Sequence, residues 1–160
     1  MLKKRRFEKM YKLYADDIFK FIFVHTRDIE LAEDLTADTF TKAWQNIDTF
    51  DGAHERGWLY KIAQNKVTDH WRKKKAVPLS EEFEVADDKP STEEKVDTSL
   101  EAQRVHKALA TLPEQMRSVV ALRFMQGYSV KQTAEALHMS ESNVRVVQFR
   151  ALKKLEGVLS

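Results

Sequence analysis

Apolar residues recur at every third or fourth position through most of the chain, which is the spacing that gathers them on one face of an α-helix. The spacing predicts helices over residues 4–25, 29–47 and 57–74 in the first half, and over 101–111, 113–126, 129–137 and 140–158 in the second. No stretch alternates with a period of two for long enough to indicate a strand. The sequence therefore predicts an all-α protein.

The helices of the second half have recognisable end signals. Pro113 suits the first position of a helix, and Gly127 suits the cap after a last turn. Ser129 and Gln132 have the spacing of a capping box, and Ser140 can cap the helix that follows it. These signals divide the second half into four short helices.

The last two predicted helices are joined by a turn of about three residues, 138–140, as in a helix-turn-helix unit. One side of the final helix is apolar and is predicted to be core: Val144, Val147, Ala151, Leu155 and Val158. The opposite side and its shoulder combine arginines with an exposed ring: Ser142, Arg145, Val146, Phe149, Arg150 and Lys153. Arginine can pair with guanine, and apolar side chains can contact the thymine methyl group, so this face is predicted to contact DNA. Two alternatives stay open, a helical hairpin without a DNA role and a Phe149 that packs against another helix.

The helix predicted over 29–47 has a buried side made of Ala32, Leu35, Thr39, Phe40, Ala43 and Ile47. Its opposite side is acidic and small: Asp34, Ala37, Asp38, Thr41 and Gln45. Such a face does not attract phosphate, so it is either a solvated surface or a docking surface for another protein.

The helix predicted over 57–74 has a different character. Its core side is Leu59, Ile62, Ala63, Val67 and His70, and its outer side carries Lys61, Asn65, Thr68 and Arg72 before a basic end at 72–75. Several aromatic residues lie nearby in the sequence: Phe40, Trp44, Phe50, Trp58, Tyr60 and Trp71. Basic and amide groups beside aromatic rings suit single-stranded DNA, whose bases stack on rings. Most of these rings are nevertheless predicted to be core, because a small module needs large side chains to bury enough area.

The net charge of +2 conceals an uneven distribution along the 160 residues. Residues 1–75 carry +4, residues 76–100 carry −6, and residues 101–160 carry +4. The middle segment has two of the three prolines and no helical spacing. We interpret it as an acidic linker between two basic modules, 1–75 and 101–160, although a merely solvated loop has the same composition.

Composition also argues against several classes of function. The chain has no cysteine, which excludes disulfides and thiolate-ligated metals. Its five histidines never fall at metal-ligand spacing, and no nucleotide-binding loop or nucleophile elbow is present. The most apolar stretch, 18–24, is too short to span a bilayer, and no apolar run follows the basic N-terminus. We therefore expect a cytoplasmic protein that is not an enzyme and needs neither metal nor cofactor.

At the level of motifs the chain resembles the extracytoplasmic-function (ECF) sigma factors, the small promoter-specificity subunits of bacterial RNA polymerase. The motifs of the first module are Ala32–Phe40 with Lys42–Trp44, and Trp58–Asn65. Those of the second module are Leu112–Glu114 with Arg117, Gly127–Ser129, Asn143–Arg145 and Arg150–Ala151. The resemblance covers about residues 10–75 and 102–157. It implies that the modules are the second and fourth sigma domains, which read the −10 and −35 promoter elements.

The resemblance also implies roles for particular residues. Asp34, Asp38 and Thr41 match the face that docks on the clamp helices of the largest polymerase subunit, and Ala37 and Gln45 share that face; Ala37 stands where glutamine is common. The −10 element would be contacted by a specificity loop and the helix after it: Phe50, His54, Arg56, Lys61, Asn65, Thr68, Asp69 and Arg72, with Asn65 holding a flipped base. The −35 element would be contacted by Arg123, Ser142, Arg145, Val146, Phe149, Arg150 and Lys153. Val146 stands where serine is frequent, and Asn143 where threonine is usual, so the −35 sequence itself stays open.

The implied partners are core RNA polymerase, through its clamp helices and flap, promoter DNA, and an anti-sigma factor, which many family members have in membrane-bound form. The chain itself would act as a monomer. The main rival hypothesis is a stand-alone helix-turn-helix transcriptional regulator, which accounts for 102–157 but gives no use to the faces of the first module. A second rival is an adaptor bundle that binds only protein.

Overall fold

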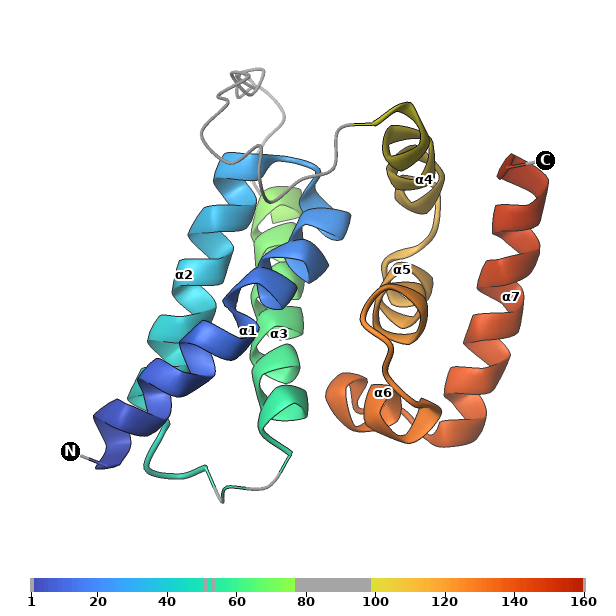
Figure 1. Ribbon diagram of the computed structural model, residues 1–160. Coiled ribbons are helices and arrows are strands. Elements are labelled where there is room, and N and C mark those ends of the chain that lie inside the picture. The colour runs from blue at the N-terminus through green and yellow to red at the C-terminus, as the bar shows by residue number, and fades with distance from the viewer. Residues whose placement is uncertain (1, 51, 53, 77–98, 160) are drawn as a thin grey trace.

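The computed structural model describes residues 2–50, 52, 54–76 and 99–159, and every regular element within these ranges is helical. Seven α-helices and one π-helical segment follow one another along these described residues (Figure 1). Their bounds are α1 Leu2–Thr26, α2 Ile29–Gln45, α3 Glu55–Ala76, α4 Leu100–Ala110, α5 Glu114–Val120, η2 Ala121–Met125, α6 Val130–Leu137 and α7 Glu141–Leu159. The all-α prediction is confirmed, and each predicted helix agrees with the observed bounds to within a turn.

Three predicted helix ends are confirmed by hydrogen bonds and backbone geometry. The Ser129 hydroxyl accepts from the N–H of Gln132 at 3.0 Å, and the Gln132 side chain accepts from the N–H of Ser129 at 2.9 Å. This reciprocal pair completes the capping box of α6. The Ser140 hydroxyl accepts from the N–H of Asn143 at 3.1 Å, and Gly127 has a φ of +73°, which favours glycine.

The helix predicted over 113–126 departs from a regular α-helix in two respects. Pro113 is the N-cap residue of α5 and not its first helical residue. The last turn is the π-helical segment η2, after which the N–H of Gln126 donates to the carbonyl of Ala121, five residues back, at 2.9 Å. A single π turn leaves no recognisable mark on the apolar spacing of so short a helix, so the sequence does not predict it.

Helices α1, α2 and α3 pack on one another to form the first module (Figure 1). The predicted core side of α2 is buried at each position within the helix: Ala32, Leu35, Thr39, Phe40 and Ala43. Ile47, which lies just beyond the end of α2, is buried as well. In α3, Leu59, Ala63 and Val67 are fully buried, whereas Ile62 and His70 are half-buried. The spacing of apolar residues therefore predicted the inner faces of both helices.

Helices α4 to α7 and η2 form the second module, with α7 along the edge farthest from α2 (Figure 1). Val144, Val147 and Ala151 of α7 are buried as predicted, and Leu155 is half-buried. The prediction for Val158 is wrong, because its side chain is 50% exposed. A helical projection gives the direction of a side chain but not how far the neighbouring helices extend, and Val158 lies in the last turn of α7.

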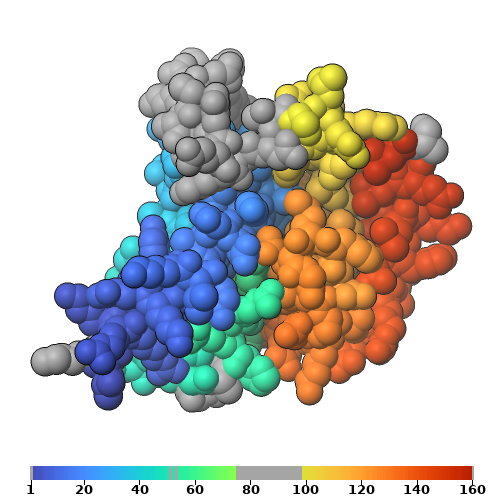
Figure 2. Space-filling view, viewed as in Figure 1, coloured from blue at the N-terminus to red at the C-terminus, as the bar shows by residue number. Residues whose placement is uncertain are grey.

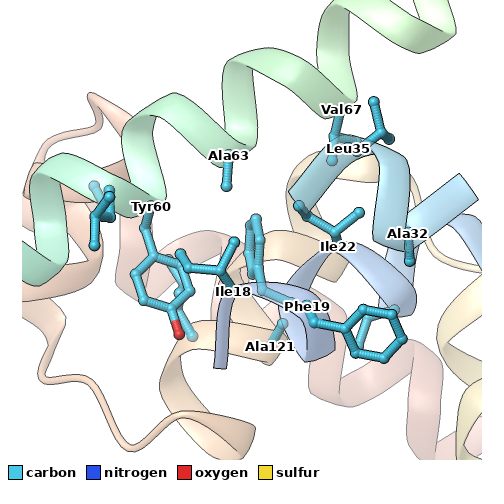
Figure 3. Close-up of a cluster of buried hydrophobic side chains, with 14 of the residues drawn as sticks. Ile18, Phe19, Ile22, Ala32, Leu35, Tyr60, Ala63, Val67 and Ala121 are labelled. Carbon is cyan, nitrogen blue, oxygen red and sulfur yellow. The ribbon is translucent and has the colours of Figure 1, made fainter. Parts of the chain in front are cut away.

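The two modules pack against each other and share one buried cluster. Figure 3 shows Ala121 of η2 in the same cluster as Ile18, Phe19 and Ile22 of α1. Helix α3 contacts α6, and α1 contacts α4, α5 and η2. The surfaces of the two modules meet without a gap in this view (Figure 2). The acidic linker predicted over 76–100 falls almost wholly on 77–98, outside the described residues.

Candidate nucleic-acid interface

Helices α6 and α7 form the predicted helix-turn-helix unit, and the turn between them is tight. His138 closes α6 in the left-handed conformation, with a φ of +56°, and the N–H of Met139 donates to the carbonyl of Ala134 at 3.0 Å. On the outer side of α7 the predicted −35 residues are all exposed: Ser142, Arg145, Val146, Phe149, Arg150 and Lys153. The structure thus brings this set together on one accessible face.

The predicted contact face of α7 is only loosely engaged within the protein. Phe149 is 63% exposed, which excludes the alternative that it packs against another helix. Arg145 pairs with Glu141 at 3.6 Å, and the Lys153 ammonium lies 5.6 Å from the centre of the Phe149 ring. Exposed pairs of this kind contribute about 0–1 kcal/mol, so these cations can turn to a new partner at little cost.

Arg123, the −35 residue predicted from the preceding helix, is half-buried and already engaged. Its Nε–H donates to the Gln148 side chain at 2.8 Å, and its Nη1 donates to the carbonyl of Tyr128 at 2.5 Å. The guanidinium therefore ties η2 to α7 and to the segment before α6. Arg123 lies beside the helix-turn-helix unit, and its contact with the −35 element stays a prediction.

The acidic face predicted on α2 is confirmed as an exposed surface, opposite the buried side of the helix: Asp34, Ala37, Asp38, Thr41 and Gln45. Trp44, which adjoins this face, is 44% exposed, and its ring meets that of Phe7 edge-on with 5.3 Å between ring centres. Sequence reasoning placed Trp44 among rings that were mostly expected in the core. Its exposure adds an apolar element to an otherwise polar surface.

The predicted −10 residues lie on α3 and in the segment before it. Phe50 is 8% exposed and stacks on Trp58, with 4.4 Å between ring centres and 16° between ring planes. The Arg6 guanidinium from α1 lies 4.6 Å from the centre of the Phe50 ring. Phe50 and Trp58 line an open hollow of about 450 Å³ together with His54 and Lys61. The predicted loop runs from 50 to 56, and its residues 51 and 53 lie outside the described residues.

The remaining predicted −10 residues form two groups along α3. Asn65 is exposed and lines a second hollow, between α3 and the α5–α6 part of the second module. Asp69 and Arg72 are exposed at the far end of α3 and pair with each other at 3.5 Å. Thr68 is half-buried, and its hydroxyl donates to the Glu114 carboxylate at 3.0 Å.

The second module covers part of this predicted −10 surface. Glu135 of α6 pairs with His54 at 3.6 Å, and the hollow between α3 and α6 is closed on one side by α6 residues. The Arg56 guanidinium lies 4.4 Å from the centre of the Tyr128 ring, and its Nη2 donates to the carbonyl of Gln126 at 3.3 Å. The structure is therefore a closed conformation in which the second module covers part of the predicted −10 surface, whereas the outer face of α7 stays exposed.

A buried polar seam joins the modules beneath these surface contacts. The Ser118 hydroxyl lies 2.6 Å from Oε1 of Gln64 and 3.1 Å from Nε2 of His25, and Nη1 of Arg117 lies 3.4 Å from Nδ1 of His25. The single hydroxyl proton of Ser118 goes to Gln64, so the Nε2–H of His25 donates to Ser118 and Nδ1 accepts from Arg117. Burial, together with the positive charge of Arg117, lowers the pKa of His25 to about 3, which keeps the imidazole neutral.

Sequence reasoning missed this seam and the role of Arg6. His25, Gln64 and Ser118 come from three distant parts of the chain, and no local spacing relates them. The basic run at 3–6 has no spacing in the sequence that relates it to Phe50. Within the described residues, no group of His, Asp or Glu side chains is arranged to hold a metal ion, and no described helix is long and apolar enough to cross a membrane.

Family models match the chain in the order of its two modules. The Sigma-70 region 2 model matches residues 10–77, and the Sigma-70, region 4 model matches residues 102–155. With the exposed basic face of α7, these matches define the class of protein as a two-module RNA polymerase sigma factor. The predicted module order agrees with them.

Curated relatives narrow the class to a family. The chain is 31% identical to the ECF RNA polymerase sigma factor SigX of Bacillus subtilis, over 93% of this chain and 81% of SigX. It is 28% identical to SigM of the same organism, over 94% of this chain and 93% of SigM. It is 32% identical to BldN of Streptomyces coelicolor, over 96% of this chain but only 60% of that longer protein. The chain belongs to the ECF family of sigma factors, and it is a promoter-specificity factor for transcription initiation.

Solved structures agree with this assignment at the level of fold. The sigma factor RpoE of Bartonella quintana, solved with the anti-sigma factor NepR, has a TM-score of 0.77 at 24% identity and covers 97% of each chain. CnrH, solved with the cytosolic domain of CnrY, has a TM-score of 0.69 at 26% identity, covering 98% of this chain and 88% of CnrH.

Proposed function

We propose that the chain divides promoter recognition between its modules. Residues 101–160 bind the −35 element through the outer face of α7, and residues 1–75 hold an extruded −10 base against α3 and the loop before it. The observation that carries the proposal is the exposed Phe149 ring among cations. A large ring held in water between arginines favours a partner that offers both phosphates and apolar methyl groups, and the DNA major groove offers both.

The acidic face of α2 supports a protein partner rather than a nucleic acid. Asp34 and Asp38 repel phosphate, and the neighbouring exposed Trp44 suits a partly apolar interface. We assign this face to the clamp helices of core RNA polymerase, and the second module to its flap. The stand-alone regulator gives this face no role.

Promoter binding then requires the modules to separate. Glu135 beside His54, and Glu114 beside Thr68, place carboxylates where DNA phosphates would otherwise lie. The interface also holds the Tyr60 hydroxyl, which is buried without a hydrogen-bond partner among the described residues. An unsatisfied buried hydroxyl costs about 1–3 kcal/mol, which separation recovers through hydration. Core polymerase, by binding each module at its own place, holds them apart.

An anti-sigma factor is the further partner that we propose. CnrH, which shares 26% of its residues with the chain, was solved with the cytosolic domain of CnrY. A partner that binds both modules in the closed conformation would keep the −10 surface masked by mass action. The proposed site of action is the cytoplasm, where RNA polymerase works, and no catalytic step is assigned to the chain.

Gel-shift titrations on one mapped promoter fragment test the proposal. The free chain is expected to bind weakly and with little sequence preference, because the closed conformation masks the −10 surface and the net charge is only +2. With core polymerase present, binding should become sequence-specific, since the fixed spacing of the modules turns the second contact into an intramolecular one. Tight, specific binding by the free chain that polymerase does not improve would contradict the proposal and favour the stand-alone regulator.

A further inference from the structure

The first residues of α1 contact the segment that joins α2 to α3. The Arg6 guanidinium lies 4.6 Å from the centre of the Phe50 ring, and Lys3 forms an ion pair with Asp48. A Cβ atom added at Gly52, whose φ is +88°, would come within 2.9 Å of Nη2 of Arg6. The guanidinium therefore lies directly against the backbone of this segment as well as on its ring.

Arg6 and Trp58 both contact the ring of Phe50. The Trp58 ring is nearly parallel to Phe50 with 4.4 Å between ring centres, and the Arg6 guanidinium lies 4.6 Å from the centre of the Phe50 ring. A planar guanidinium stacks well on a ring, and the charge adds attraction to the π-system. These two contacts together hold the ring of Phe50 and the path of the chain around it.

The local energetics of α1 do not account for this cluster of cations. The first turn of α1 contains no acidic residue, and the helix dipole disfavours positive charge at an N-terminus. Among the described residues, the ring contact of Arg6 and the ion pair of Lys3 both go to the α2–α3 segment. The cations at the start of α1 are therefore stabilised by their contacts with the α2–α3 segment, and not by the dipole of their own helix.

We propose that Arg6 is a positioning residue for −10 recognition. It holds Phe50 against Trp58, and these two rings form the wall of the hollow that also contains His54 and Lys61. This inference rests on the proposed function, in which that wall encloses the extruded −10 base. Arg6 acts through Phe50, so its effect falls on discrimination between bases at one promoter position.

A base-substitution series with holoenzyme tests the inference. Initiation is measured on a mapped promoter carrying each of the four bases at every −10 position, with the wild-type chain and the variants Arg6→Ala, Arg6→Lys and Arg5→Ala. Arg5 is the matched control, because it is exposed, adjacent in α1 and carries the same charge. Core polymerase binding and thermal unfolding are recorded for each variant.

The wild-type chain is expected to discriminate most strongly at one −10 position. Arg6→Ala should lower that discrimination about two- to fivefold, because this factor corresponds to the loss of one cation–π contact. Discrimination at the other positions and the affinity for core polymerase should stay unchanged. Arg6→Lys keeps the charge but not the planar face, so it should restore only part of the loss, and Arg5→Ala should match the wild type.

Two results would overturn the role of Arg6. One is an Arg6→Ala variant that discriminates as well as Arg5→Ala. The other is a uniform loss at every base that Arg6→Lys fully restores, which would make Arg6 a phosphate contact. A wild-type chain whose initiation does not depend on any −10 base would instead overturn the proposed function, and the inference with it.

Discussion

The imidazole Nε2 of His25 in α1 lies 3.1 Å from the hydroxyl of Ser118 in α5, although the two residues are 93 positions apart in the sequence. Both side chains are buried, and the hydroxyl of Ser118 donates a hydrogen bond to the amide oxygen of Gln64 in α3. One short polar seam thus connects the helix that would read the −10 element to the module that would read the −35 element. Opening the protein requires this seam to break.

Replacing Ser118 by alanine should weaken the closed conformation. The substitution leaves the Nε2–H of His25 and the amide oxygen of Gln64 without their partner, at a cost of roughly 1–3 kcal/mol. Urea unfolding should show this decrease in the free energy of unfolding. Ser142→Ala on the exposed face of α7 is the control and should change stability by less than about 0.5 kcal/mol. Equal changes in the free energy of unfolding for the two substitutions would argue against a stabilising role of the seam.

Acid should destabilise the protein through His25. The pKa of His25 falls from 6.5 in the unfolded chain to about 3 in the fold, mainly through burial and then through Arg117. At a pH between these two pKa values, the unfolded chain binds a proton at His25 that the folded protein does not bind. The contribution of His25 to the free energy of unfolding is therefore complete above pH 6.5 and is lost as the pH falls toward 3. The slope from this one group is about 1.4 kcal/mol per pH unit at most.

Unfolding free energies of wild type and His25→Gln between pH 7 and 4 measure this contribution. The variant should show a shallower dependence on pH, by roughly one bound proton. His138→Asn is the control, since His138 is exposed and asparagine tolerates its left-handed conformation. A slope that His25→Gln leaves unchanged would mean that the imidazole is not held neutral in the fold.

Arginine-to-alanine substitutions on α7 should reduce promoter use without affecting polymerase binding. A bidentate contact from arginine to guanine is worth about 1–3 kcal/mol, so Arg145→Ala or Arg150→Ala should lower initiation roughly 5- to 100-fold. Lys107→Ala is the control, because Lys107 is an exposed cation on α4, outside the helix-turn-helix unit. Initiation that survives both arginine substitutions would favour an adaptor that binds only protein.

Charge reversal on α2 should have the complementary effect. Asp38→Arg places a cation in the centre of the acidic face and should weaken binding to core polymerase about tenfold or more, with the fold unchanged. Asp16→Arg changes the same charge at an exposed position of α1 and should bind normally. Competition with labelled wild-type chain for core polymerase measures both. If the two variants bound core polymerase with equal affinity, the acidic face of α2 would not be part of the polymerase interface.

The surfaces of single helices could be predicted from the sequence because they depend on local spacing. The buried side of α2 and the exposed Phe149 follow from a projection at 3.6 residues per turn, and the Ser129 capping box follows from a three-residue spacing. Val158 shows where the method fails, since its exposure depends on how far a neighbouring helix extends.

Contacts between distant segments could not be predicted in the same way. The seam depends on how two modules pack, and its residues are ordinary polar side chains whose pairing has no sequence signature. Arg6 meets Phe50 only because α1 crosses the α2–α3 segment. The covering of His54 by Glu135 of the second module likewise exists only in the assembled fold.

Transcription of sheared genomic DNA by core polymerase, with and without the chain, tests sigma activity most directly when the 5′ ends of the RNA are mapped. New start sites that share −35 and −10 motifs at a fixed spacing are the expected result, and the same motifs provide the promoter for the experiments above. A folded chain that binds core polymerase and yields no new start sites would contradict promoter recognition by these two modules.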